Sequence, residues 1–377
     1  MPLDPEGTGA LNTDVIELTE QKQSFVFRNV GARPVLSLNR GFSAPVTLEA
    51  KLSPEDELFL MAHDRDSFNR WEAGQRLGRE LMLEAYAGKP NDTGVAAYAG
   101  ALRRILADSA LDDAFKALML VQPTEAEIAA ALGADVDTDR VHAARDGLRS
   151  ALARHLLEDL ERIRRRTAET GAYMPDPAST ARRALAQAAL ALMVMGDSAR
   201  GIAWAQSELE APHSMSAEMG ALSALIQVDC PEREAELARF HARHGHEHLL
   251  IDKWLLLNAQ AQGGDAPSRV EQLTHHPDFK WTTPNKVYAL FTGFTGGNQA
   301  GFNAADGSGY RVVADAILKL DPVNPQVAAR LATGFRSCKL LNAQRKAAAE
   351  GELWRGLGEP SPSRDGYEIG SKNLKGW

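Results

Sequence analysis

The sequence predicts a mostly α-helical protein, an irregular superhelix of paired helices preceded by a few antiparallel β-strands. Three observations support this fold class. Short segments with β-like alternation of apolar and polar residues occur only before residue 52. From Ser53 to Leu353 the apolar residues instead recur at helical spacing, in about fifteen segments. The connections between these segments are short, which favours antiparallel helix neighbours.

The first part of the chain contains four β-like segments, at residues 14–18, 24–27, 35–38 and 46–50. In the second segment Phe25 and Phe27 alternate with Ser24 and Val26, which is the period of a half-buried strand. Four strands without a second layer would leave one face or edge of the sheet uncovered. These segments therefore predict, at most, part of a β-sandwich.

The helical part is expected to begin at Ser53. Serine is a good N-cap, Pro54 suits the first helical position, and the two acidic residues that follow complement the helix dipole. Helices are expected, among others, at residues 66–86, 137–169, 179–195, 231–244, 247–260 and 309–320. Their uneven lengths argue against a strict sequence repeat, so we expect an irregular HEAT- or armadillo-like superhelix over residues 53–355.

Residues 284–331 contain the densest series of helix start and stop signals in the chain. A glycine-dense connector is expected at residues 293–301, a turn at residues 306–309 and a new helix start at Asn324, which precedes a proline. Further on, glycine and proline residues interrupt the helical pattern again. We therefore expect an irregular tail over residues 356–377.

Composition argues against several classes of function. The 377 residues carry a formal net charge of −8 with a pI of about 5.7, which disfavours a nucleic-acid or anionic-membrane partner. Cys230 and Cys338 lie far apart and follow no C-x-x-C spacing, so neither a disulfide framework nor a zinc ribbon is predicted. Since no signal peptide and no membrane-spanning run is found, we expect a cytoplasmic protein.

Residues 244–248, with the sequence HGHEH, fit the H-x-x-E-H pattern of inverted zinc peptidases. Such a site needs both outer histidines on one face of a continuous helix. Gly245 instead favours a helix end, so we interpret the segment as a polar junction between two helices. The conventional H-E-x-x-H motif is absent, because Leu250 stands where its second histidine would be. We expect no catalytic residue and no metal or other cofactor in this chain.

A basic cluster stands at the end of the long helix expected at residues 137–169. It consists of Arg162, Arg164, Arg165 and Arg166. Cations at a helix C-terminus complement the helix dipole, and we favour this interpretation over a phosphate-binding or RNA-binding role.

The order of several motifs resembles the C-terminal region of the bacterial aminopeptidase N (alanyl aminopeptidase) family of M1 zinc metallopeptidases. The motifs are FSAPV at residues 42–46, FNRWEA at 68–73, DKW at 252–254 and NPQVA at 324–328, together with the helix start and stop signals of residues 284–331. Their order is more specific than any one of them. The resemblance implies that residues 1–52 are the C-terminal part of an Ig-like β-sandwich domain and residues 53–355 the helical C-terminal domain.

The resemblance also implies a function. The parent enzyme would remove N-terminal residues from peptides with a zinc-activated water, and this chain would cap the active site and wall the peptide-binding chamber. Its partners would be the parent's catalytic domain and peptide substrates. The zinc and its ligands would belong to that catalytic domain, because the family's G-x-M-E-N motif is absent here as well. We expect this chain to be inactive alone.

Gln326 and Arg330 are the candidate site residues. They stand at positions i and i+4 of the helix that follows Asn324, so they face the same way, as any surface pair at this spacing would. In similar aminopeptidases, the glutamine and arginine that match this motif line the enclosed cavity near the active site.

The alternative function comes from a different class of protein. An autonomous HEAT-like scaffold that binds a protein partner on a concave face has the same composition and helical pattern. Composition alone does not separate it from part of an enzyme.

Overall fold

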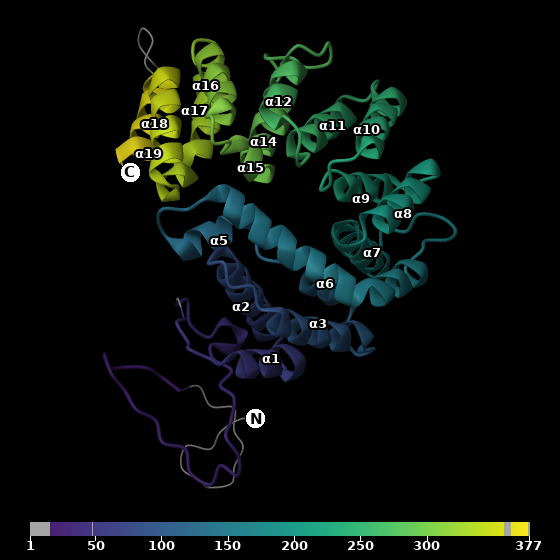
Figure 1. Ribbon diagram of the computed structural model, residues 1–377, viewed down its shortest axis with the longest axis vertical. Coiled ribbons are helices and arrows are strands. Elements are labelled where there is room, and N and C mark those ends of the chain that lie inside the picture. The colour runs from purple at the N-terminus through teal and green to yellow at the C-terminus, as the bar shows by residue number, and fades with distance from the viewer. Residues whose placement is uncertain (1–15, 47, 358–362, 376–377) are drawn as a thin grey trace. The chain divides into compact units, whose positions relative to one another are not determined.

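The computed structural model describes residues 16–46, 48–357 and 363–375 (Figure 1). Within these ranges the chain is mostly helical, and they contain no β-strand. None of the helices in the described part of the chain is both long and apolar enough to cross a membrane. The chain divides into two compact units, Met1–Leu77 and Gly78–Trp377.

The first unit does not show the predicted strands. Its described residues before α1 (Pro54–His63) contain only a short 3₁₀ turn, η1 (Arg40–Phe42). Strands are stabilised by pairing with neighbours, and the described backbone of residues 16–46 and 48–52 has no such ladder. Several apolar side chains there stay exposed, including Leu18 and Val26. The expected segments 14–18 and 46–50 lie partly outside the described residues.

Side-chain hydrogen bonds attach the end of this segment to the first helices of the same unit. Asn69, near the start of α2 (Ser67–Tyr86), donates to Ser37 Oγ at 2.8 Å and to the Leu38 carbonyl at 2.9 Å. The rings of Phe42 and Phe68 are in contact, with centroids 4.3 Å apart. The motifs FSAPV and FNRWEA, which are separate in the sequence, therefore meet in space.

The second unit is a succession of helices, and the bounds of each follow here. They are α3 (Asp92–Ala107), α4 (Asp113–Met119), α5 (Glu125–Leu132), α6 (Thr138–Arg166), α7 (Pro177–Gly196), α8 (Ser198–Glu210), α9 (Met215–Leu225), α10 (Pro231–His244), α11 (His248–Gln260), α12 (Ala266–Thr274), α13 (Pro284–Val287), α14 (Gly293–Gly297), α15 (Gln299–Phe302), α16 (Ser308–Leu320), α17 (Pro325–Ala332), α18 (Ala343–Leu357) and α19 (Arg364–Lys375). All six helices that we expected by range are present, with ends within three residues of those predicted. The prediction of a mostly helical protein is confirmed.

Polar N-caps explain where many of these helices start. Ser53 accepts a hydrogen bond from the Asp56 amide at 3.2 Å, as its sequence context predicts. Thr124 and Glu127 form a reciprocal capping box at the start of α5. These caps satisfy amides that the helix itself leaves unpaired, so each fixes a helix end at a defined residue.

The centre of the second unit is the packing of α6 against α7, and α7 in turn packs on α8 and α9. The face of α6 that is buried carries Leu148, Leu152, Leu156 and Leu160, at intervals of one helical turn. Burial of each leucine contributes roughly 2 kcal/mol. This packing holds the C-terminal end of α6 beside the start of α7, where a pocket lies.

The glycine-dense segment differs from its prediction as a connector. Residues 284–297 are helical throughout, with a π-helical turn, η2 (Tyr288–Thr292), between α13 and α14. Two glycines of α14 lie against α11: a Cβ on Gly293 would come within 2.7 Å of Leu256, and one on Gly297 within 2.5 Å of Gln260. The glycines therefore allow close helix packing, which the sequence pattern did not distinguish from a turn.

The tail also differs from its prediction. Residues 364–375, expected to be irregular, form α19, which packs on α17 and α18. Gly366 and Gly370 are buried, and a Cβ on Gly366 would come within 2.8 Å of the Asp321 carboxylate, so the helix lies close to its neighbours there. Residues 358–362 and 376–377 lie outside the described residues.

A junction joins the beginning of α6 to the C-terminal part of the same unit. The Val136 amide donates to the Leu340 carbonyl at 2.9 Å, and the Asn342 amide donates to the Val136 carbonyl at 2.9 Å. The two segments run parallel and form an isolated β-bridge. Leu340 ends a 3₁₀ helix, η3 (Thr333–Leu340), and α5 and α6 also pack against η3 and α15 respectively.

Arg345 occupies the buried centre of this junction, with 5% of its surface exposed. Its Nε donates to the carbonyl of Asn303 at 2.8 Å, and its two terminal nitrogens contact the carboxylates of Asp137 and Asp139. One guanidinium group thus links α6, α18 and the end of α15, using donors that only a planar fork presents together.

Replacing Arg345 with alanine should destabilise the helical unit. The substitution removes donors to three acceptors, one of them a buried carbonyl, at an expected cost of about 2 kcal/mol in the free energy of unfolding. The measurement is urea denaturation of the purified chain followed by circular dichroism. Arg336→Ala is the matched control, because Arg336 is exposed in η3, and its effect should stay within about 0.5 kcal/mol. Equal effects of the two substitutions would contradict the structural role of Arg345.

Candidate functional site

The predicted pair, Gln326 and Arg330, stands on the exposed face of α17. Asn324 caps this helix through a 3.3 Å hydrogen bond from the Val327 amide to its Oδ1. Both Gln326 and Arg330 are exposed, whereas the opposite face of the helix is buried. Within the described part of the chain the Arg330 side chain has no hydrogen bond or ion pair in the structure. Its donors are open to a ligand, and the role of the pair stays a prediction.

The H-x-x-E-H segment is divided between two helices. Helix α10 ends at His244, α11 begins at His248, and Gly245 caps α10, so the expected break at Gly245 is present. Gly245 has a φ of −61°, which is right-handed and not the left-handed value common at helix ends. His244 Nε2 lies 3.0 Å from Glu218 Oε2. The two outer histidines therefore do not share a helix face and do not fit an inverted zinc-peptidase site.

The basic cluster at the end of α6 is neutralised within the protein. Arg165 pairs with Glu161 at 2.8 Å, and Arg166 pairs with Asp113 at 2.7 Å. The other two members pair as well, Arg162 with Asp159 and Arg164 with Glu208. Each arginine of the cluster therefore already faces a carboxylate within the protein. Its members stabilise helix contacts as well as facing the α6 dipole.

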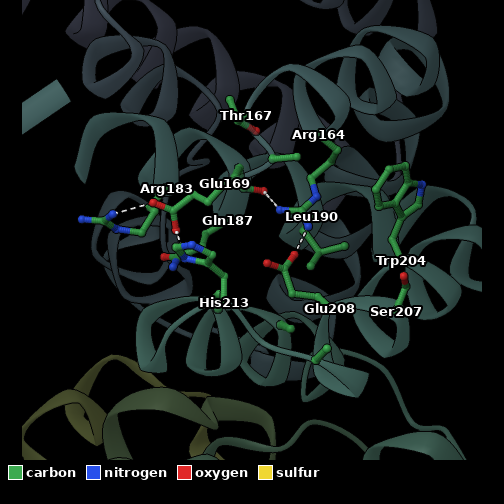
Figure 2. Close-up of a pocket in the computed structure, with 16 residues that line it drawn as sticks. Arg164, Thr167, Glu169, Arg183, Gln187, Leu190, Trp204, Ser207, Glu208 and His213 are labelled. Atoms are coloured by element: carbon green, nitrogen blue, oxygen red, sulfur yellow. Dashed lines mark hydrogen bonds and ion pairs between the residues drawn. The ribbon is translucent and has the colours of Figure 1, made fainter. Parts of the chain in front are cut away.

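A pocket of about 210 Å³ lies between the end of α6 and helices α7, α8 and α9 (Figure 2). Each of these helices, or the segment next to it, contributes lining residues. The charged and polar members include Arg164, Glu169, Arg183, Gln187, Glu208 and His213, and the indole of Trp204 lines it too. The packing of α6 on α7 brings together residues that are up to 57 positions apart in the sequence.

Two buried arginines define the charge of this pocket. Arg164 is 8% exposed and donates to the Ala186 carbonyl at 3.2 Å while also pairing with Glu208. Arg183 is 6% exposed and pairs with Glu169 at 2.7 Å. Since each guanidinium already faces a carboxylate, the pocket carries little net charge.

Two polar atoms at the pocket are buried without a hydrogen-bond partner in the structure, Arg164 Nε and His213 Nδ1. His213 Nε2 contacts the Gly171 carbonyl at 2.7 Å, which leaves Nδ1 facing Glu169 at 3.3 Å in a geometry too poor for a hydrogen bond. Unsatisfied buried groups favour a polar guest. The arrangement suits ordered water or a small polar molecule. Among the lining residues, no nucleophile is hydrogen-bonded to a general base.

The pocket and its ion pairs were not predicted. Of the charged residues that line it, only Arg164 was singled out in the sequence, as a helix-end cation. The pairing partners Glu208 and Glu169 belong to separate segments, and no local spacing connects them. An arginine on the apolar face of α6, at the four-residue spacing from Leu160, was the one available signal of a buried charge.

Two family models match the chain. The model described as a domain of unknown function, DUF3458_C, with ARM repeats matches residues 54–375. The model described as DUF3458, with an Ig-like fold, matches residues 2–51.

Proteins named aminopeptidase N are similar in sequence to almost the whole of this chain. Aminopeptidase N of Caulobacter vibrioides is 36% identical over 369 residues, which is 98% of this chain and 43% of that protein. Aminopeptidase N of Escherichia coli is 31% identical over 364 residues, 96% of this chain and 42% of that protein. The crystal structure of Legionella pneumophila aminopeptidase A in complex with aspartic acid has a TM-score of 0.85 at 27% identity, covering 100% of this chain and 45% of that one. The chain thus spans less than half the length of these relatives.

Removing the carboxylate of Glu208 should lower the free energy of unfolding, because the buried Arg164 then lacks a counter-charge. In Glu208→Gln the guanidinium keeps its place but loses its counter-charge, and we expect a loss of roughly 2 kcal/mol in the free energy of unfolding, less than for a fully enclosed pair. Glu210→Gln, at an exposed position of the same helix, should change it by less than about 0.5 kcal/mol. Denaturant unfolding measures both.

The double variant Arg164→Met with Glu208→Leu checks the explanation. It removes both charges, so it should recover most of the lost stability. If Glu208→Gln proved as mild as Glu210→Gln, the ion pair would not be a structural element of the pocket.

Proposed function

The chain belongs to the DUF3458_C family of ARM-repeat domains, and on this premise we propose that it is the helical C-terminal domain of a larger, zinc-dependent aminopeptidase of the M1 family. The observation that carries the proposal is the extent of the match. Relatives named aminopeptidase N match almost all of this chain, while the chain accounts for only 42–43% of those from Caulobacter vibrioides and Escherichia coli. The catalytic machinery would lie in the remainder of the parent protein.

The chain's own residues support this division of labour. An aminopeptidase of this type needs an H-E-x-x-H helix for zinc and its base, and the only similar segment here is split between α10 and α11. The zinc ion, when bound elsewhere in the parent, would supply an activated water. In this proposal the residues of this chain take no part in the catalytic step.

The proposed role of the helical unit is to cap the active site and wall the chamber that holds peptide substrates. An array of stacked helices provides an extended, rigid surface, which suits a wall that limits access to small peptides. Residues 1–52 would complete an Ig-like β-sandwich with strands that the rest of the parent provides. We also propose a cytoplasmic location and no nucleic-acid or membrane partner, in line with the acidic composition.

Within this proposal, Gln326 and Arg330 face the chamber. Their exposed amide and guanidinium groups suit peptide carbonyls or a C-terminal carboxylate, because both present N–H donors to oxygen acceptors. The alternative, an autonomous scaffold for a protein partner, has no observation of its own in its favour, since the relatives extend well beyond this region.

The isolated chain should not hydrolyse alanyl substrates. The expected result for purified chain with alanine p-nitroanilide and added zinc is a rate indistinguishable from buffer, because the H-E-x-x-H motif is absent. The full-length parent, expressed from the surrounding reading frame and assayed identically, is the positive control. Activity of the isolated chain that survives repurification would contradict the proposed division.

Arg330→Ala in the full-length enzyme should raise KM for tri- and tetrapeptides about tenfold, the loss of one charge-assisted hydrogen bond. KM for single-residue amides should change little, because only a peptide extends from the metal to the chamber wall. Arg336→Ala, another exposed arginine of the same region, serves as the control and should alter neither class. An equal effect of Arg330→Ala on both substrate classes would remove this residue from the chamber.

A further inference from the structure

Three potential metal ligands converge where α10 and the segment after α12 meet. His241 lies in the last turn of α10, while His276 and Asp278 follow the end of α12. Each offers one ligand atom, and these atoms all lie within 4.8 Å of one another. We propose that His241, His276 and Asp278 bind a divalent transition-metal ion, with zinc as the leading candidate.

The distances in the cluster are close to those of a metal site. Oδ2 of Asp278 lies 2.7 Å from His241 Nε2 and 3.7 Å from His276 Nδ1. Zinc bonds to nitrogen and oxygen are about 2.0–2.2 Å long, which places tetrahedral ligands about 3.3 Å apart. These two separations lie on both sides of that value, and the ligand atoms of all three residues lie within 4.8 Å of one another.

A buried tryptophan holds both imidazoles in position. The ring of Trp254 lies 4.6 Å from that of His241 and 4.9 Å from that of His276, measured between centroids. Trp254 is itself fixed, because it is 8% exposed and its indole nitrogen donates to the Leu237 carbonyl at 3.1 Å. The Trp254 ring therefore fixes the positions of both imidazole rings, which remain partly accessible to solvent.

The hydrogen bond at His276 also suits a metal ion. The Asp278 amide donates to His276 Nδ1 at 3.2 Å, so this nitrogen is unprotonated and carries a lone pair. A metal ion bound to this nitrogen would replace that long hydrogen bond. Metal ligation requires an unprotonated imidazole nitrogen, and the hydrogen-bond geometry provides one at His276.

The ligand types indicate the class of metal. Two imidazoles and one carboxylate suit zinc and its neighbours cobalt, nickel and copper, whereas magnesium and calcium prefer oxygen ligands. Three protein ligands would leave a fourth position for water. A bound ion would cross-link α10 to the segment after α12, replacing the existing hydrogen bond between His241 and Asp278.

From the sequence we expected no metal in this chain, because local motifs bring together only ligands that are close in sequence. His241 was noted beside the H-x-x-E-H segment, but its partners stand 35 and 37 positions further on. The site that we propose uses none of residues 244–248, so it is independent of that motif and of the proposed function.

The test is a zinc titration of the purified full chain after chelator treatment, followed by isothermal titration calorimetry and thermal unfolding. We expect one zinc ion per chain and a Tm that rises by several degrees in excess zinc, with no response to magnesium. Cobalt should give the visible absorption bands of a tetrahedral site.

Variants assign the ligands. His276→Ala and Asp278→Asn should each weaken zinc binding by about 100-fold and abolish the cobalt bands, and asparagine at position 278 keeps an oxygen to accept from His241 so that the fold is retained. His275→Ala and His244→Ala are the controls, as neighbouring histidines outside the cluster, and they should change affinity by less than about twofold.

Three results would overturn the proposal. They are the absence of saturable zinc binding, binding that persists in both His276→Ala and Asp278→Asn, or equal losses in the two control variants. The last of these would identify adventitious binding by surface histidines.

Discussion

The helical unit depends on a contact between segments that are 208 residues apart, the pairing of Arg345 with the start of α6. In a linear helix array each repeat contacts only its neighbours. Here the backbone bridge between Val136 and Leu341 adds a connection between distant parts of the array. Closing a flexible loop of this length costs about 5 kcal/mol in chain entropy. The packed helices within the loop reduce that cost, because they already limit the distance between its two ends.

This closure has a consequence for the surface that α17 presents. Helix α17 packs between α16 and α19, and η3 connects it directly to the junction. Its exposed face, with Gln326 and Arg330, is therefore carried by elements that are anchored on several sides. A ligand-binding surface gains from such anchoring, since side chains held by a rigid scaffold lose less conformational freedom on binding.

Much of the fold could be predicted from the sequence, because helix periodicity and caps are local signals. Ser53 marked the first helix, and Gly245 marked a break that excluded a tempting zinc motif. The predictions that were not confirmed depend on neighbours. Gly293 and Gly297 look like turn residues until α11 is placed against them, and α19 becomes a helix through its packing on α17. The expected strands at the N-terminus have no partner strand in the described residues.

The candidate sites were harder to predict for the same reason. The ion pair of Arg164 with Glu208 is assembled from separate segments, and so is the cluster of His241, His276 and Asp278. No local sequence spacing predicts either of them. By contrast, Gln326 and Arg330 share one helix, so their common face followed from the four-residue spacing.

The junction at Arg345 also affects how the protein is made. Translation at about 5–20 residues per second separates the synthesis of Asp137 from that of Arg345 by roughly 10–40 s. During this interval the start of α6 contacts earlier segments such as Tyr86, but the carboxylates of Asp137 and Asp139 lack the guanidinium group that later pairs with them. The helical unit can therefore lock only after Arg345 has been synthesised, which leaves the nascent unit most vulnerable to proteolysis before α18 emerges from the ribosome.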